Sequence, residues 1–362
     1  MNEVAKTIVI AAGGTAGHVV PAIAVADALR AEGTEVSFIG GTRAEAQLVP
    51  AAGFPLHTIQ VEGLSRSNPL RALRALALAV AAVPRARALL RQLAPDAVMG
   101  GGGYVAGPVG VAAVSMRIPL VLTEADSHLG LSNRLLARFA RRVCLAFPLA
   151  GRDGRRYLLT GRPIPPPVHD RLQARQRFGI EPDETCVLVF GGSLGARSIN
   201  LAAVTAFAQG SSLAGLRVRV LHVSGRRDHA ELAARQLPVG YELRDYLELA
   251  DFADALAAAD LVVARSGGSV FEIAAHGRPA ILVPYPHASA DHQSTNARWM
   301  SDAGAAIVIP DAELNAASLG EALAALLGDR ERLAAMAAAA KGLARPDAAS
   351  DVAHELLAAA RP

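Results

Sequence analysis

Hydrophobic residues follow two alternating patterns along the chain. Short, nearly continuous apolar runs alternate with longer stretches in which apolar residues recur every three to four positions. The runs are typical of strands buried on both faces of a parallel sheet, and the longer stretches are typical of the helices that cover it. In the first half we predict strands at 36–41, 96–101, 119–125 and 142–147. In the second half we predict them at 217–225, 260–268, 280–285 and 305–309.

The start of this pattern occurs twice. Residues 8–30 and 186–207 each contain an apolar run, a glycine turn and a helix-like stretch, so Gly13-Gly14-Thr15-Ala16-Gly17 corresponds to Gly191-Gly192-Ser193-Leu194-Gly195. Units of this kind build doubly wound sheets, whose ligands bind beyond the carboxyl ends of the strands. We therefore predict an α/β protein with two Rossmann-like, doubly wound parallel-sheet domains that face one another across a cleft.

A proline-dense segment at 160–170 separates the two halves, and 362 residues exceed what a single core commonly holds. This places an N-terminal domain at 1–162 and a C-terminal domain at 163–345. The helix predicted within 346–362 is expected to pack back on the N-terminal domain. The apolar run before Gly13 is interpreted as a first strand, because no cleavage site follows it.

Charge is distributed unevenly between the halves. Residues 1–162 contain 18 Lys and Arg against 10 Asp and Glu, a net +8, whereas residues 163–362 contain 18 against 23, a net −5. A basic first half indicates an anionic partner, such as phosphate, acidic lipid or nucleic acid; the alternative is arginine enrichment without a binding role. The longest uninterrupted apolar run, Ala75–Val83, is much shorter than the ~18 residues of a membrane span. A cytosolic protein with peripheral membrane contact is expected, and Cys144 and Cys186 are expected to pack in the core.

The glycine turns indicate phosphate binding. The first N–H groups of a helix lack partners and carry about half a positive charge, which favours anions. A dinucleotide fold requires Gly-x-Gly-x-x-Gly and an acidic residue after the second strand, where this chain has Gly40-Gly41. Neither turn contains the lysine of an ATP-binding P-loop. Hydride transfer and ATP hydrolysis are therefore disfavoured.

Five motifs in this order and spacing resemble those of the MurG family. They are GGTAGHVVPAIAVA (13–26), GGYVAGP (102–108), GGSLGARSIN (191–200), RSGGSVFEIAAHGRPAILVPYPHASADHQSTNA (265–297) and PDAA (346–349). The resemblance implies an inverting glycosyltransferase of GT-B fold that requires neither a cofactor nor a metal. Such enzymes transfer GlcNAc from UDP-GlcNAc to the MurNAc 4-hydroxyl of undecaprenyl-diphosphate-linked MurNAc-pentapeptide (lipid I). The product is lipid II, a peptidoglycan precursor.

The resemblance also assigns roles to individual residues. Donor contacts are expected at Thr15, Ala16, Gly17, Ser193, Gly195, Asn200, Arg265, Gly268, Ser269, Glu272 and Gln293. The acceptor's diphosphate is expected at Gly13, Gly14, Gly102, Gly103 and Tyr104. Glu272 is assigned to the ribose hydroxyls, with stabilisation of a helix N-terminus as the alternative. His18 and Glu124 are the two candidates for the general base, which must accept the proton of the attacking hydroxyl. The alternatives are that His18 binds the diphosphate and that neither residue is the base.

The chain departs from the family pattern at several positions. Ala16 replaces a glycine, Thr123-Glu124-Ala125-Asp126 replaces His-Glu-Gln-Asn, Pro165 replaces an arginine, and Leu194 replaces a glutamine. We assign no binding role to Asp126, Pro165 or Leu194, and Arg162 is the candidate for the missing positive charge. These departures leave the choice of sugar nucleotide open.

Residues 64–93 are rich in arginine, contain no acidic residue and place Leu70, Leu73, Leu76 and Val80 on one helical face. Such a surface favours anionic lipid, which predicts a peripheral protein on the cytoplasmic face of the cell membrane. The alternative is a helix packed on the sheet with a solvated basic face. No nucleic-acid partner is expected. Two other functions stay open: another reaction of the same fold, either UDP-sugar transfer or UDP-GlcNAc 2-epimerisation, and nucleotide binding without catalysis.

Overall fold

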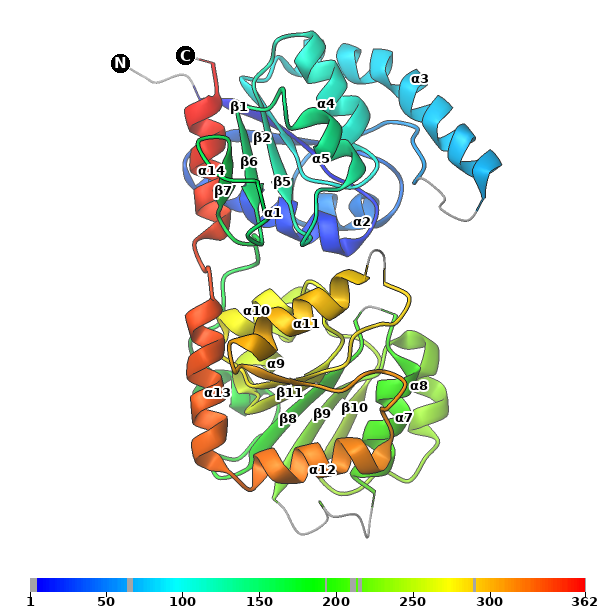
Figure 1. The fold of residues 1–362 in the computed structure, drawn as a ribbon, viewed down its shortest axis with the longest axis vertical. Helices are drawn as coiled ribbons and strands as arrows, with labels where there is room; N and C mark the ends of the chain where they lie inside the picture. Colours follow the sequence, from blue (N-terminus) through cyan, green and yellow to red (C-terminus); the bar gives the residue numbers. More distant parts are fainter. Residues whose placement is uncertain are drawn as a thin grey trace. The chain divides into compact units, whose positions relative to one another are not determined.

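The computed structural model describes residues 5–63, 68–192, 194–208, 213, 217–288 and 291–361. The chain divides into two compact units. The first comprises Met1–Pro165 and Arg345–Pro362, and the second comprises Pro166–Ala344 (Figure 1).

Among the described residues, seven parallel strands form the sheet of the first unit in the order β3-β2-β1-β4-β5-β6-β7. Their bounds are β1 Thr7–Ala11, β2 Glu35–Gly40, β3 Leu56–Thr58, β4 Ala97–Gly100, β5 Leu120–Glu124, β6 Arg142–Leu145 and β7 Tyr157–Leu159. Ile10 of β1 lies opposite Phe38 on one side and Met99 on the other. The strand order therefore reverses direction between β1 and β4, which is the topological switch point where ligands of such sheets bind.

Both faces of this sheet are buried, which explains its continuous apolar runs. Ile8 and Ile10 pack into a core with α1 (Ala16–Ala31), α2 (Ala44–Ala51) and α14 (Ala348–Ala359). Val9 and Ala11 point to the opposite core, with α3 (Pro69–Leu93), α4 (Ala106–Ser115) and α5 (Leu131–Leu136). Because alternate residues of a strand face opposite sides of the sheet, the five residues of β1 contribute side chains to both cores.

Helix α3 has two dissimilar halves. It begins at a cap in which the Asn68 side chain accepts a hydrogen bond from the Arg71 N–H (3.0 Å), with a proline at the first helical position. Its second half packs into the core through Ala82, Ala86, Leu89 and Leu90. Its first half exposes Leu70, Leu73, Leu76 and Val80, each between 55% and 78% exposed, so packing of this face on the sheet was the wrong alternative.

The described part of the second unit holds a six-stranded parallel sheet in the order β10-β9-β8-β11-β12-β13. Its strands are β8 Thr185–Phe190, β9 Val218–Val223, β10 Tyr241–Arg244, β11 Leu261–Ala264, β12 Ala280–Leu282 and β13 Ala306–Val308. Its helices are α6 Arg171–Arg177, α7 Arg197–Ala206, α8 Arg226–Ala233, α9 Leu249–Ala258, α10 Val270–Ala275, α11 His292–Asp302, α12 Ala316–Leu327 and α13 Arg330–Leu343. The switch point of this sheet lies between β8 and β11.

The two parallel, doubly wound sheets confirm the predicted fold class. Cys144 in β6 and Cys186 in β8 are buried, and burial raises the pKa of each thiol to about 12. Both therefore act as small core residues, as expected.

Candidate active site

The first two glycine turns meet at the switch point of the first sheet, because one follows β1 and the other follows β4. Gly14, Gly102 and Gly103 all have positive φ angles, of 112°, 89° and 73°. A Cβ atom on Gly103 would lie 2.0 Å from the Gly13 carbonyl oxygen, so the two backbones are in direct contact. The fold therefore brings together the residues predicted for the acceptor's diphosphate: Gly13, Gly14, Gly102, Gly103 and Tyr104.

A carboxylate that the sequence did not point to lies beneath these turns. Glu45, from the first turn of α2, is 0% exposed. It accepts hydrogen bonds from the N–H groups of Gly14 (2.8 Å) and Gly41 (2.9 Å) and from the Tyr104 hydroxyl (3.1 Å). The Gly14 N–H thus already has a partner within the protein.

His18 lies in the first turn of α1, against the second glycine turn. A Cβ on Gly102 would come within 2.8 Å of its Nδ1 atom. Burial lowers the pKa of His18, and the positive charge of Arg162 lowers it further, against the opposing charge of Asp126. The imidazole is consequently neutral near pH 7 and can accept a proton.

Glu124, the other candidate base, ends β5 and is only 6% exposed. Its Oε2 atom accepts hydrogen bonds from the Gly130 N–H (2.7 Å) and the Asn133 amide (3.0 Å), and its Oε1 atom accepts one from the Asp126 N–H (3.2 Å). Burial raises the pKa of Glu124 despite these bonds. The carboxylate therefore fastens the loop between β5 and α5.

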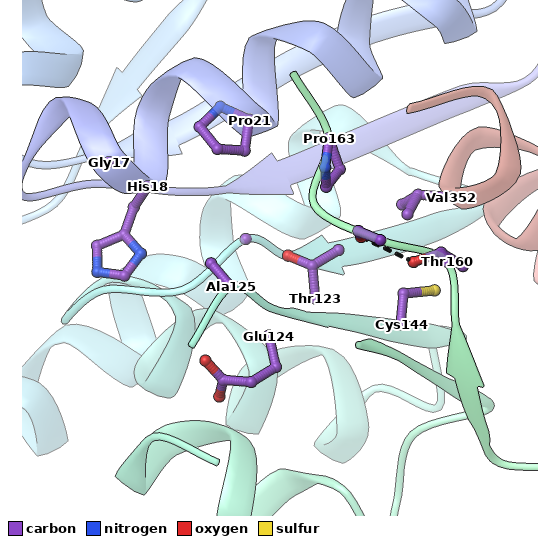
Figure 2. Close-up of a pocket in the computed structure, with 12 residues that line it drawn as sticks. Gly17, His18, Pro21, Thr123, Glu124, Ala125, Cys144, Thr160, Pro163 and Val352 are labelled. Carbon is purple, nitrogen blue, oxygen red and sulfur yellow. Dashed lines mark hydrogen bonds between the residues drawn. The ribbon is translucent and has the colours of Figure 1, made fainter. Parts of the chain in front are cut away.

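His18 and Glu124 line one small pocket of the first unit, together with Gly17, Thr123, Ala125 and Thr160 (Figure 2). Arg162 crosses beside it: its guanidinium donates to the carbonyl oxygen of Gly17 (2.5 Å) and, at 3.5 Å, to that of Ala125. Arg162 is buried, so its charge is held next to the first turn. Thr15 caps α1 without a side-chain hydrogen bond, and Thr15 and Gly17 are exposed.

A glycine turn also follows β8, the first strand of the second unit. A Cβ on Gly195 would lie 2.0 Å from the Ser224 carbonyl oxygen, so the turn after β8 packs on the one after β9. Gly192 and Gly195 have φ angles of 92° and 75°. Ser193 lies outside the described residues. The exposed Gly192 and Leu194 put the surface of this turn in contact with solvent.

Asn200, predicted to contact the donor, is 0% exposed. Its amide nitrogen donates to the Ser224 carbonyl oxygen (2.9 Å) and to the Asp228 carboxylate (3.0 Å), and its oxygen shares a hydrogen bond with His222 Nε2 (3.0 Å). Nδ1 of His222 is hydrogen-bonded to the Tyr241 hydroxyl (2.7 Å). The amide thus joins α7 to β9 and α8 beneath the turns.

A third turn, Ser266–Ser269, follows β11 and leads into α10. Ser266 Oγ donates to the Gln293 carbonyl oxygen (2.8 Å), and the Asn296 amide donates to the Ser266 carbonyl oxygen (2.9 Å). Sequence reasoning missed Asn296, which is buried on α11 and ties this turn to that helix. Gly267, Gly268 and Ser269 reach the surface, and Glu272 on α10 is partly exposed.

Arg265 and Gln293 are engaged within the protein. The Arg265 guanidinium donates to the carbonyl oxygens of Val283 and Pro284 and to Ser198 Oγ, and it forms an ion pair with Asp311 (2.6 Å). The Gln293 side-chain oxygen accepts a hydrogen bond from the Tyr285 N–H (2.9 Å). Both side chains therefore fix the backbone around the third turn.

Family models match both units. Residues 8–145 match the glycosyltransferase family 28 N-terminal domain, and residues 186–352 match the glycosyltransferase family 28 C-terminal domain. The chain is 44% identical over 354 residues to the UDP-N-acetylglucosamine--N-acetylmuramyl-(pentapeptide) pyrophosphoryl-undecaprenol N-acetylglucosamine transferase of Aeromonas hydrophila, covering 97% of this chain and 96% of that protein.

Solved structures show the same architecture. MurG of Acinetobacter baumannii superposes with a TM-score of 0.77 at 30% identity, covering 98% of this chain and all of that one. A putative UDP-N-acetylglucosamine 2-epimerase from Listeria monocytogenes superposes with a TM-score of 0.67 over 96% of this chain and 94% of that chain. At 16% identity, the second likeness shows the fold alone.

Proposed function

Because the chain belongs to the MurG family of N-acetylglucosamine transferases, within glycosyltransferase family 28, we infer that it transfers GlcNAc from UDP-GlcNAc to lipid I. The product is lipid II, the precursor of peptidoglycan. The observation that carries this inference is 44% identity to a curated transferase across 97% of the chain.

On the acceptor side, we propose that His18 is the general base. The MurNAc 4-hydroxyl attacks C1 of GlcNAc, the bond from C1 to the UDP oxygen breaks, and the hydroxyl proton passes to the base. His18 suits this role because burial keeps its imidazole neutral, whereas three N–H donors already occupy the oxygens of Glu124. The diphosphate of lipid I is assigned to the turns at Gly13–Gly14 and Gly102–Tyr104.

On the donor side, we propose that some of the predicted residues contact UDP-GlcNAc and that others support the turns that hold it. Gly195, Gly268 and Ser269 are proposed to present backbone or hydroxyl groups to UDP-GlcNAc, and Glu272 to bind the ribose hydroxyls. Thr15, Ala16 and Gly17 of the first unit keep their predicted assignment as donor contacts. Asn200, Arg265 and Gln293 support the turns, because their polar atoms bond to other protein groups. The leaving UDP gains negative charge, and fixed N–H donors are most effective where such charge develops. Glu272→Ala should raise the KM for UDP-GlcNAc with little change in the acceptor KM.

We also propose that the layer of α3, α4 and α5 rests on anionic lipid at the cytoplasmic face of the membrane. Besides the exposed residues of α3, this layer and the segment just after it expose Val111, Leu131, Leu135 and Phe139, interspersed with arginines. None of the helices within the described ranges is long and apolar enough to cross a bilayer. A peripheral surface that combines apolar and basic side chains gives reversible attachment close to a lipid-linked acceptor.

The test is incubation of the purified protein with radiolabelled UDP-GlcNAc, with and without a short-chain lipid I analogue. We expect label in the lipid product only when the acceptor is present. Release of UDP and ManNAc without acceptor would indicate epimerisation instead. Donor binding without turnover in either condition would indicate a nucleotide-binding protein that has no catalytic activity.

A further inference from the structure

Glu45 is a buried carboxylate that takes no part in the proposed chemical step. Four glycines surround it: a Cβ would lie 2.7 Å from its Oε1 on Gly13, 2.8 Å from the same atom on Gly41, and 2.9 Å from its Cγ on Gly40. Gly14 donates its N–H to the other carboxylate oxygen. The glycines after β1 and β2 therefore leave space for this one carboxylate.

The hydrogen bonds of Glu45 join segments far apart in the chain. Gly14 follows β1, Gly41 follows β2, and Tyr104 follows β4, so a single side chain fastens three strand ends. Burial opposes ionisation, but the hydrogen bonds from Gly14, from the Glu45 backbone N–H, from Tyr104 and from Gly41 together outweigh it, and the pKa of Glu45 lies below its ordinary value. Burial and the charge of Glu45 raise the pKa of Tyr104 to about 12, so its hydroxyl remains a donor.

This geometry excludes Glu45 as a ligand contact. Its two oxygens already accept three hydrogen bonds, and a carboxylate exposed to a diphosphate would repel it. Its effect is on shape, because it holds Gly14 at a φ of 112° and keeps the Tyr104 turn against Gly13. The first residues of α1 follow directly after this anchored glycine, so the position of Gly14 also sets where the helix begins.

We propose that Glu45 is a positioning residue for acceptor binding: it fastens the turns after β1 and β4 in the arrangement that receives the diphosphate of lipid I. The inference rests on the proposed function, and it adds a residue that contacts neither substrate. Without the carboxylate, two backbone N–H groups and one hydroxyl lose their shared acceptor. We expect this loss to make the turns after β1 and β4, which receive the diphosphate, less ordered.

The experiment compares Glu45→Gln with Glu32→Gln, an exposed glutamate after α1, in the transfer assay. A glutamine places an NH2 group against one of the N–H donors. We expect the KM for the lipid I analogue to rise about tenfold or more, while the KM for UDP-GlcNAc stays within about twofold. Glu32→Gln should change neither constant. Because the Tyr104 hydroxyl donates to Glu45, Tyr104→Phe should cost less in the Glu45→Gln background than in the wild type.

Two results would overturn the proposal. One is an unchanged acceptor KM in a folded Glu45→Gln variant. The other is an equal rise in both KM values together with a lower melting temperature, which would indicate general loosening of the unit. Failure of the wild type to transfer GlcNAc would instead refute the proposed function, so the two failures are distinguishable.

Discussion

Replacing Asn200 by alanine should destabilise the second unit by about 3 kcal/mol. The side chain is fully buried, and its three hydrogen bonds reach Ser224, Asp228 and His222. Asp228 keeps its bonds to Arg227, whereas the Ser224 carbonyl oxygen and His222 Nε2 lose a partner that water cannot replace. A buried polar group left unsatisfied costs about 1–3 kcal/mol, so two of them cost about 2–6 kcal/mol, and the stated value lies in the lower half of that range.

The melting temperature should fall by about 6–12 °C, because 1 kcal/mol corresponds to about 2–4 °C for a domain of this size. Trp299, the one tryptophan of the chain, lies in α11 of the second unit, so its fluorescence reports the unfolding of that unit. Thr205→Ala, an exposed substitution on the same helix α7, is the matched control and should leave the midpoint unchanged. An unchanged midpoint for Asn200→Ala combined with loss of UDP binding would refute this reasoning, because Asn200 would then act as a ligand contact.

Three further predictions concern proton transfer, pH and membrane attachment. His18→Gln should lower kcat at least about 100-fold with little change in the KM for the donor. The kcat of the wild type should fall only at pH values below 6.5, where His18 becomes protonated, and a pH-independent kcat would contradict this role. Burial lowers the pKa of His222 to about 4, so between pH 6.5 and 4 the unfolded chain binds a proton that the folded chain does not. Stability of the second unit should therefore fall as the pH drops through this range, by up to about 1.4 kcal/mol per pH unit. In His222→Gln, the melting temperature measured by Trp299 fluorescence should depend less on pH over the same range. Leu73→Glu with Leu76→Glu should weaken sedimentation with phosphatidylglycerol vesicles about tenfold or more. Leu172→Glu, a similarly exposed position of the second unit, should not; equal losses would contradict a specific membrane face.

The main strands were predictable because both of their faces are buried. An apolar run, a glycine turn and a helix-like stretch occur twice in this order, and this repeat predicted two strand–helix pairs, β1 followed by α1 and β8 followed by α7. The missed strands β3, β7 and β10 lie at sheet edges and span only three or four residues. A run that short, covered on fewer sides, carries too little periodic signal to separate it from a loop.

The candidate site was predictable where backbone shape requires glycine, and not where tertiary contacts create the environment. Gly14, Gly102 and Gly103 belong to the glycine turns that the motifs identified, and each has a positive φ that favours glycine. Glu45 resembles a surface residue of a short helix, and only the approach of Gly14, 31 positions away, buries it. Asn200 and Asn296 match motif positions, but the sequence does not indicate that their amides face inward.

The most direct test of the central claim is the acceptor dependence of GlcNAc transfer. With radiolabelled UDP-GlcNAc and a short-chain lipid I analogue, we expect one labelled lipid product, inverted at C1 of GlcNAc, and almost no donor consumption when the analogue is omitted. Rapid donor consumption without the analogue, or a product with retained configuration, would contradict it.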